Sequence, residues 1–228
     1  MFDVLSLRPI EFPEGFCWGS ATAAYQIEGD NFNCDYYQAE LDGSFDEPCG
    51  KACNGYALYR QDVDLIRRLG HRAYRFSVEW SRVEPARGEF DAEALEHYVD
   101  QARRLTEAGI QPWITLHHFT NPMWLADLGG WHDGRAVDAF CRYAERVVPA
   151  LAPYAAGWVP INEYNLHGGM PPAPENHVKT AGLKLNFLLA DAKCYDIVKT
   201  HSQAPCGSPL AYVRFDPHRK HDTPDRLL

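Results

Sequence analysis

Hydrophobic residues recur every three or four positions in four segments of the chain. These segments are residues 55–69, the stretch between Asp91 and Gly109, residues 137–151 and residues 180–200. Such spacing places the apolar side chains on one face of an α-helix. Asp91 is a favourable N-cap residue and Gly109 is typical of a helix C-terminus, so we predict four amphipathic helices.

Short apolar runs of strand length alternate with these helices. They cover residues 16–23, 73–80, 112–118, 157–163 and 207–215. Regular alternation of strand and helix predicts a parallel sheet whose strands are connected by crossover helices. We therefore expect an α/β protein with about five parallel strands.

Polar residues at the ends of successive runs distinguish between the two common parallel folds. Glu79 ends the second run, a histidine pair at 117–118 ends the third, and Asn162 and Glu163 end the fourth. In a (β/α)8 TIM barrel such strand ends converge on the face that carries the active site. A doubly wound sheet often has a glycine-rich phosphate turn, and no such motif follows these runs. We therefore predict a partial (β/α)8 barrel.

The composition narrows the range of functions. The formal net charge of -9 would repel polyphosphate, so we expect no nucleic-acid partner. No apolar run reaches the length of about 18 residues that a membrane span needs. The N-terminus lacks a signal-peptide pattern, so we expect a cytoplasmic protein. The seven cysteines fit no zinc pattern, and we expect reduced thiols, no metal and no cofactor.

A series of short motifs runs through the first two thirds of the chain. They are FPEGF at 12–16, WGSATAAYQIEG at 18–29, YRFS at 74–77, WSR at 80–82, TLHHF at 115–119, GGW at 129–131 and INE at 161–163. Together they resemble the signatures of glycoside hydrolase family 1, the β-glucosidase family. The resemblance implies a retaining glycosidase on a (β/α)8 barrel. It would hydrolyse O-glycosidic bonds in β-linked glucosides or related sugars.

The resemblance also implies roles for individual residues. Glu163 would be the general acid/base. The remaining candidates are Gln26 and His118 for sugar hydroxyls, Asn162 near the scissile bond, Arg75 beside the nucleophile and Trp131 against the same sugar. His117 precedes His118 on the predicted strand, and adjacent strand residues face opposite sides, so the pair is not expected to share a metal ion.

The sequence departs from the family pattern at the acid/base motif and after it. Tyr164 stands where the family usually has proline, and the Glu-Asn-Gly-type motif that carries the family's nucleophile does not occur. A retaining glycosidase needs two carboxyl groups. We therefore expect residues 1–228 to be a single N-terminal portion of the barrel, missing the last strands. A second chain or self-association would complete it.

Other interpretations of the chain stay open. Glu79 is a weaker candidate for the second carboxylate, because Arg82 three residues later favours an ion pair instead. The chain could also be a non-catalytic sugar-binding or interaction module that keeps Gln26, His118 and Asn162. An inactive truncated product is the third interpretation.

Overall fold

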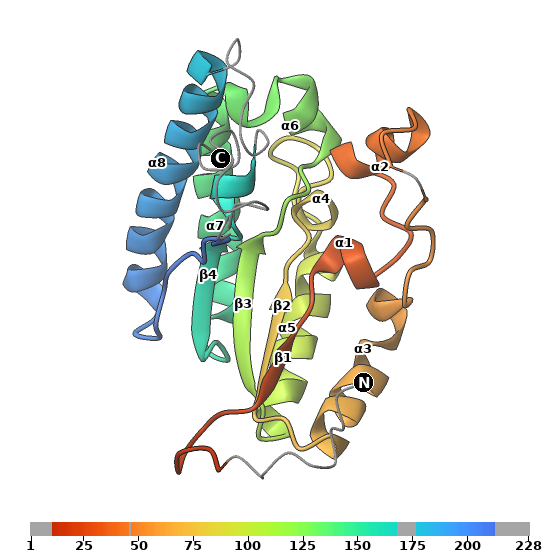
Figure 1. Cartoon of the computed structure of the whole chain (residues 1–228), viewed down its shortest axis with the longest axis vertical. Coiled ribbons are helices and arrows are strands. Elements are labelled where there is room, and N and C mark those ends of the chain that lie inside the picture. Colours follow the sequence, from red (N-terminus) through yellow and green to blue (C-terminus); the bar gives the residue numbers. More distant parts are fainter. Residues whose placement is uncertain (1–10, 46, 168–176, 213–228) are drawn as a thin grey trace, which may run out of the picture.

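Four parallel strands form the centre of the structure, a computed structural model that describes residues 11–45, 47–167 and 177–212. They lie in one sheet in the order β1-β2-β3-β4 (Figure 1). Their bounds are Gly19–Ala21 for β1, Ala73–Ser77 for β2, Gln111–His117 for β3 and Gly157–Ile161 for β4. Every neighbouring pair is parallel, as the alternation of strands and helices predicted.

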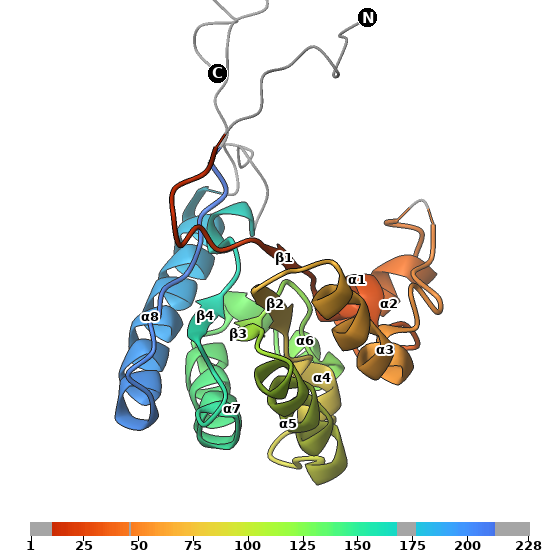
Figure 2. The same cartoon turned by 90° about the horizontal axis from the view of Figure 1, so that it is seen from below.

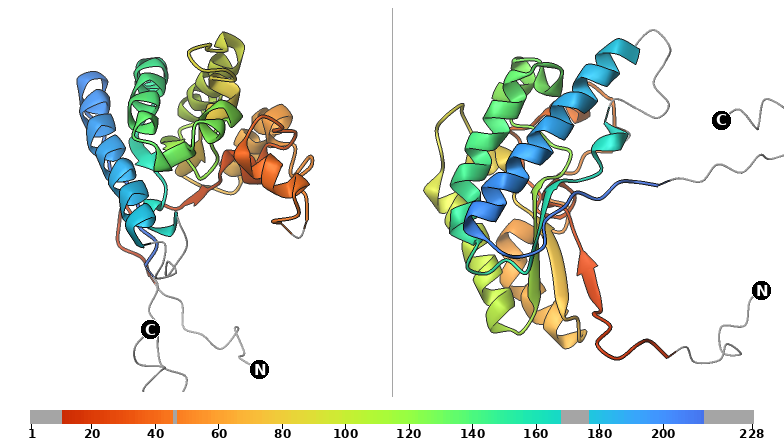
Figure 3. Two further views of the ribbon diagram at one scale, coloured as in Figure 1. Left: turned by 90° about the horizontal axis from the view of Figure 1, so that it is seen from above. Right: turned by 90° about the vertical axis from the view of Figure 1, so that its left-hand side faces the viewer.

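Four long helices cover one face of this sheet. They are α3 (Gly55–Arg68), α5 (Ala92–Glu107), α7 (Arg135–Leu151) and α8 (His177–His201). Figure 2 shows them in a row in chain order, with α3 at one end and α8 at the other. Figure 3 shows no long helix of the described chain on the opposite face of the sheet. The chain therefore forms a curved, open portion of a barrel.

Short helices gather beyond the carboxyl ends of the strands (Figure 1). They are α1 (Ala24–Ile27), α2 (Asp35–Leu41), α4 (Trp80–Val83), α6 (Met123–Asp127) and the 3-10 helices η2 (Gly130–His132) and η3 (Tyr164–Leu166). In a (β/α)8 barrel this is the end that carries the active site. Among the helices that the structure describes, none has the length and apolar character needed to span a bilayer.

The predicted partial barrel and its helices are confirmed, whereas the fifth predicted strand is not. Within residues 207–212 the structure has no strand, and residues 213–215 lie outside the described residues. Cys206 makes a single parallel bridge to Trp158. Pro205 and Pro209 accept hydrogen bonds from the N–H groups of Trp158 and Glu163, at 2.8 and 3.0 Å. Because proline has no N–H, neither can donate back, and a regular ladder does not form.

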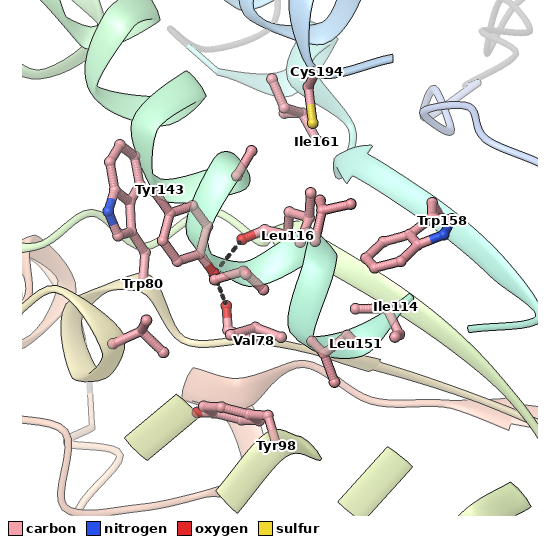
Figure 4. Packing of buried hydrophobic residues seen from close by; sticks show 14 of the residues in the cluster. Val78, Trp80, Tyr98, Ile114, Leu116, Tyr143, Leu151, Trp158, Ile161 and Cys194 are labelled. Atoms are coloured by element: carbon pink, nitrogen blue, oxygen red, sulfur yellow. Dashed lines mark hydrogen bonds between the residues drawn. The ribbon is translucent and has the colours of Figure 1, made fainter. Parts of the chain in front are cut away.

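The hydrophobic core lies between the sheet and the helices (Figure 4). Tyr143 of α7 is fully buried, and its ring stacks on Trp80 with 5.0 Å between the ring centroids. Its hydroxyl lies 3.3 Å from the carbonyl oxygen of Val78 and 3.2 Å from that of Leu116. One side chain of α7 therefore links the carboxyl ends of two strands. These are the strand ends that precede the polar residues singled out by the sequence.

Replacing Tyr143 by phenylalanine should lower the free energy of unfolding by about 1–2 kcal/mol, because the carbonyl groups of Val78 and Leu116 lose the hydroxyl donor that they share. Urea denaturation measures the change. Tyr154→Phe is the matched control, since Tyr154 is only half-buried and follows the same helix. Equal losses in the two variants would contradict the role given to the Tyr143 hydroxyl.

Candidate active site

Side chains at the carboxyl ends of three strands are linked by hydrogen bonds. Arg75 of β2 lies between Tyr74 and Phe76, which belong to the core under the helices, so its side chain lies on the opposite face of the sheet. Its guanidinium donates to Oδ1 of Asn162 and, over 2.8 Å, to Oγ1 of Thr115. A connected polar group therefore spans β2, β3 and the end of β4.

Asn162 extends this group to the histidine pair. Its Nδ2 donates to Nε2 of His118 over 3.3 Å, and its backbone N–H donates to the carbonyl oxygen of His117 over 2.9 Å. Because Nε2 of His118 accepts, the neutral ring carries its hydrogen on Nδ1. The structure thus brings together Arg75, His118 and Asn162. Their roles toward a sugar stay predictions.

Glu163 directly follows Asn162, where β4 gives way to η3. Its backbone is left-handed, with φ 47° and ψ 46°, a conformation that costs a residue with a Cβ atom about 1–2 kcal/mol. Its N–H donates to the carbonyl oxygen of Pro209. Burial lowers the pKa of Arg75, and the nearby Glu163 carboxylate opposes that shift. The candidate proton donor is therefore held at the strand end beside a guanidinium group.

Trp131 occupies an interior position. It is 3% exposed, and its Nε1–H donates to Oδ1 of Asn121 over 2.8 Å. The same oxygen lies 3.0 Å from Nε2 of His117. Asn121 is fixed in turn by Asp35, whose carboxylate accepts its backbone and side-chain N–H groups at 2.8 and 2.7 Å. Direct contact between Trp131 and a sugar, as predicted, does not fit this geometry, because the ring is covered and its donor is occupied.

Gln26 lies on α1, after the carboxyl end of β1, and its side chain is exposed. The structure places it at the active-site end of the sheet without a hydrogen bond from its side chain to His118 or Asn162. Two contacts hold α1 in place. The N–H of Ala24 donates to Oγ of Ser77 over 2.7 Å, and the buried Glu28 just after the helix is bound from two other elements.

Glu28 makes the ion pair that the sequence predicted for Glu79. Arg82 donates to Oε2 of Glu28 over 2.8 Å, and the Tyr98 hydroxyl lies 2.9 Å from Oε1. Burial raises the pKa of Glu28 to about 7, although Arg82 acts in the opposite direction. The expected Glu79–Arg82 pair is therefore wrong. Arg82 points toward the loop after β1 instead.

Glu79 turns inward and caps α4. Its Oε1 accepts from the Ser81 hydroxyl over 2.7 Å, and its Oε2 accepts from the Thr120 hydroxyl over 2.9 Å. The side chain is 2% exposed. Both oxygens are thus occupied within the protein, which argues against Glu79 as a nucleophile.

Three imidazole rings lie together at this end of the sheet. The ring centroid of His167, which follows η3, is 5.7 Å from that of His117. Burial lowers the pKa of His117 and of His118 to about 4, and that of His167 to about 3. Repulsion from Arg75 and then from His117 adds to the pKa shift of His118, and repulsion from the other two imidazoles adds to that of His167. All three are neutral at pH 7. Within the described residues, no group of three or more His, Cys, Asp or Glu side chains is arranged to hold a metal ion.

Sequence reasoning missed Asp35, Asn121 and His167 as parts of this site. Asp35 and Asn121 lie 86 positions apart, and only the folded chain shows that they meet. Asn121 precedes a proline, and an asparagine in this position is typical of an ordinary turn. His167 lies in a stretch without helical or strand periodicity, so no pattern marked it.

The parallel sheet has helices on one face and polar residues at the carboxyl ends of its strands. These features are typical of a portion of a (β/α)8-barrel enzyme. The chain belongs to glycosyl hydrolase family 1, whose family model matches residues 8–226. Beta-glucosidase A of Acetivibrio thermocellus is 36% identical over 167 residues, which cover 69% of this chain and 37% of that protein. Human cytosolic beta-glucosidase is 30% identical over 211 residues, covering 85% and 43%.

Solved structures give the same result. The β-glycosidase from Pyrococcus horikoshii matches with a TM-score of 0.84 at 32% identity, over 94% of this chain and 52% of that chain. The family 1 β-glucosidase from Thermotoga maritima, in complex with isofagomine lactam, matches with a TM-score of 0.84 at 27% identity, over 95% and 52%. The chain thus spans about half of these solved chains and less than half of the curated relatives.

The buried histidines should make the fold sensitive to acid. The pKa of His97, like those of His117 and His118, is lowered to about 4 by burial, against about 6.5 in an unfolded chain. Between these values the unfolded chain binds more protons, so stability falls as pH drops from about 6.5 to 4. Each such histidine contributes up to about 1.4 kcal/mol per pH unit. Glu28 acts oppositely, because its raised pKa favours the folded state as pH falls from about 7.

Urea midpoints at pH 7, 5.5 and 4.5 measure this dependence. His97→Gln should flatten it, and Glu28→Gln should steepen it, so the two variants control for each other. A pH dependence that is the same in His97→Gln as in the parent chain would contradict the burial of a neutral imidazole at this position.

Glu163→Gly should be more stable than Glu163→Ala by about 1 kcal/mol. Both variants remove the carboxylate, but only glycine adopts the left-handed backbone without the Cβ penalty. Comparing the two variants by thermal and urea unfolding isolates the contribution of the left-handed backbone to the free energy of unfolding. If alanine were equal or better, the left-handed conformation at Glu163 would be refuted.

Proposed function

We propose that this chain supplies the acid/base half of a retaining β-glucosidase-type active site, with Glu163 donating the proton to the glycosidic oxygen. The observation that carries the proposal is the position of Glu163 at the carboxyl end of β4, beside the linked group of Arg75, Asn162 and His118. Membership of glycosyl hydrolase family 1 supports it. So does the likeness to several proteins named beta-glucosidases.

The geometry gives Asn162 a fixed orientation. Its oxygen accepts from Arg75 and its NH2 group donates to His118, so the amide cannot rotate without breaking both contacts. Fixed dipoles and charges of this kind stabilise charge that develops in a transition state. Glu163 is the next residue, and the same strand end orients it. We assign Asn162 to positioning the substrate and Glu163 to proton transfer.

Arg75 supplies positive charge on the open face of the sheet. In a retaining mechanism the second carboxyl group lies about 5 to 5.5 Å from the acid/base and must be ionised to attack. A guanidinium beside it lowers its pKa and keeps it ionised. Neither Glu28 nor Glu79 can act as this second carboxyl group, since the carboxylate oxygens of both accept hydrogen bonds within the protein. We therefore propose that the nucleophile is brought to Arg75 from outside the described residues.

The proposed substrate is a β-linked glucoside or a related sugar. Gln26 is exposed on α1 and His118 is half-buried at the end of β3, so both can meet a ligand at this end of the sheet. We assign them to sugar hydroxyls. Trp131 and Asn121 act behind them by fixing the ring of His117, the residue before His118.

A sugar-binding module without hydrolysis is the second candidate. It is favoured by the occupied oxygens of Glu28 and Glu79, which leave Glu163 without a catalytic partner from these two residues. Calorimetry of the isolated chain with glucose or cellobiose tests it. Heat of binding that is lost in Asn162→Ala, with no turnover under any condition, would favour this candidate over the enzyme.

Glu163→Gln should slow hydrolysis by about 10²- to 10⁴-fold for an alkyl β-glucoside, whose leaving group needs a proton. The assay uses the chain mixed with the portion of Thermotoga maritima β-glucosidase that follows the aligned region. With dinitrophenyl β-glucoside, the rate of the first step should change little, because that leaving group departs as an anion. This rate is measured from the burst of dinitrophenol. Glu145→Gln, at an exposed position of α7, is the control. Equal losses on both substrates would rule out Glu163 as the general acid.

A further inference from the structure

A cavity beside α1 and α2 lies apart from the residues assigned to sugar chemistry. It is enclosed by residues 25–32, α2 and residues 48–50, and its volume is about 70 Å³, whereas one water molecule needs about 10–15 Å³. None of Arg75, His118, Asn162 and Glu163 lines it. Figure 1 places α1 and α2 toward the side of the sheet that lies away from β4. The cavity is therefore separate from the candidate active site.

Hydrogen bonds between the three segments fix the shape of this cavity. Oε1 of Glu40 on α2 accepts from the Tyr25 hydroxyl over 2.5 Å and from the N–H of Cys49 over 2.8 Å. The Cys49 thiol donates to the carbonyl oxygen of Tyr25 over 3.0 Å. The N–H of Asp30 donates to the carbonyl oxygen of Gly50 over 2.8 Å. A site held in this way loses little freedom when a ligand binds, which favours affinity for a small molecule.

The charge at the cavity is negative. Glu40 lines it, and Oε2 of Glu40 has no hydrogen-bond or ion-pair partner among the residues that the structure describes. Residues 30–50 contain six acidic side chains and no Lys, Arg or His. No basic side chain of the described residues lines the cavity either. Because no lining side chain of the protein balances the Glu40 carboxylate, the cavity attracts a positively charged ligand.

Aromatic rings form much of the cavity wall. Tyr25, Phe32 and Tyr37 line it. Phe32 packs edge-on against Tyr37 with 5.0 Å between the ring centroids, and Tyr25 packs likewise against Tyr36 at 5.5 Å. The faces of aromatic rings attract cations, and they suit organic ammonium ions in particular. A metal ion such as Ca²⁺ would need six or more oxygen ligands, which one carboxylate among aromatic rings does not provide.

A buried amide adds a hydrogen-bond donor. Asn31 lines the cavity and is 8% exposed. Its Oδ1 accepts from the Ser81 hydroxyl over 3.1 Å, whereas its Nδ2 has no partner among the described residues. A buried donor without an acceptor is costly, so an acceptor oxygen on a bound molecule would stabilise this position. A ligand with a hydroxyl group close to its ammonium group would meet both Asn31 and Glu40.

We propose that this cavity binds a small ammonium compound that carries a hydroxyl group, an amino alcohol. Its ammonium group donates to Oε2 of Glu40 and lies against the aromatic rings, and its hydroxyl oxygen accepts from Nδ2 of Asn31. A neutral sugar would also pack on the rings, but it would leave the charge of Glu40 unbalanced. The proposal does not depend on the proposed glycosidase function, because no residue assigned to that function lines the cavity.

Titration of the chain with ethanolamine, followed by two-dimensional ¹H–¹⁵N NMR, tests the proposal. The backbone N–H of Cys49 and the side-chain NH2 of Asn31 should shift saturably, with a Kd of about 0.1–10 mM, since so small a ligand has few atoms to contribute. Ethylamine lacks the hydroxyl group and ethylene glycol lacks the charge. Each should therefore bind about tenfold more weakly or worse. Potassium chloride at the same ionic strength should cause no saturable shift at these groups.

Variants identify the groups that bind the ammonium ion. Glu40→Gln keeps the size of the side chain and removes its charge, so it should weaken ethanolamine binding by about tenfold or more. Phe32→Leu should weaken it by about threefold or more, because a ring face is lost. Glu47→Gln is the matched control, since Glu47 is exposed and does not line the cavity, and it should bind like the parent chain. The ¹H–¹⁵N spectrum of each variant shows whether its fold is intact.

Four results would overturn the proposal. The first is the absence of saturable shifts at about 100 mM ethanolamine. The second is that ethylene glycol or glucose binds as tightly as ethanolamine, which would make this a site for neutral hydroxyl compounds. The third is equal binding of ethylamine and ethanolamine, which would remove the role of Asn31. The last is an equal effect of Glu40→Gln and Glu47→Gln, because that would show unselective attraction of cations to the acidic segment.

Discussion

The contact between Arg75 and Asn162 is the interaction on which the site depends. The two residues lie 87 positions apart in the chain, and they meet because parallel strands deliver their carboxyl ends to one edge. A guanidinium with two acceptors from β3 and β4 is a rigid connector, since its donors are fixed in one plane. Through Asn162 it sets the backbone that carries Glu163. The chemistry of the site therefore follows from strand register.

Much of this arrangement could be predicted because it follows from local patterns. The four long helices were visible from apolar spacing, and Asp91 caps α5 as expected by accepting from the N–H groups of Glu93 and Ala94. The positions of His118, Asn162 and Glu163 followed from their place after apolar runs. The fifth strand failed for a local reason as well, because Pro205 and Pro209 fall on the positions that should donate to β4.

Long-range partner choice could not be predicted in the same way. Arg82 has Glu79 near it in sequence, yet it pairs with Glu28, which is 54 residues away, because α4 turns Glu79 toward Ser81 and Thr120. Trp131 looked like a ligand-contact residue by resemblance, and the fold instead uses its N–H to hold Asn121. In both cases the outcome depends on which buried polar group needs a partner most. Sequence spacing carries no information about that competition.

Because Pro205 and Pro209 have no N–H groups, the segment that contains them is also more free to move. The segment after α8 is attached to β4 by few backbone hydrogen bonds, together with the side-chain amide of Asn165, which pairs with both backbone groups of Ala211. This segment forms no regular ladder, so it opens locally at a lower free energy than β2 or β3, which are paired on both sides. Glu163 donates its N–H to this segment. Fluctuations that release this segment would thus reach Glu163 before they reach the core.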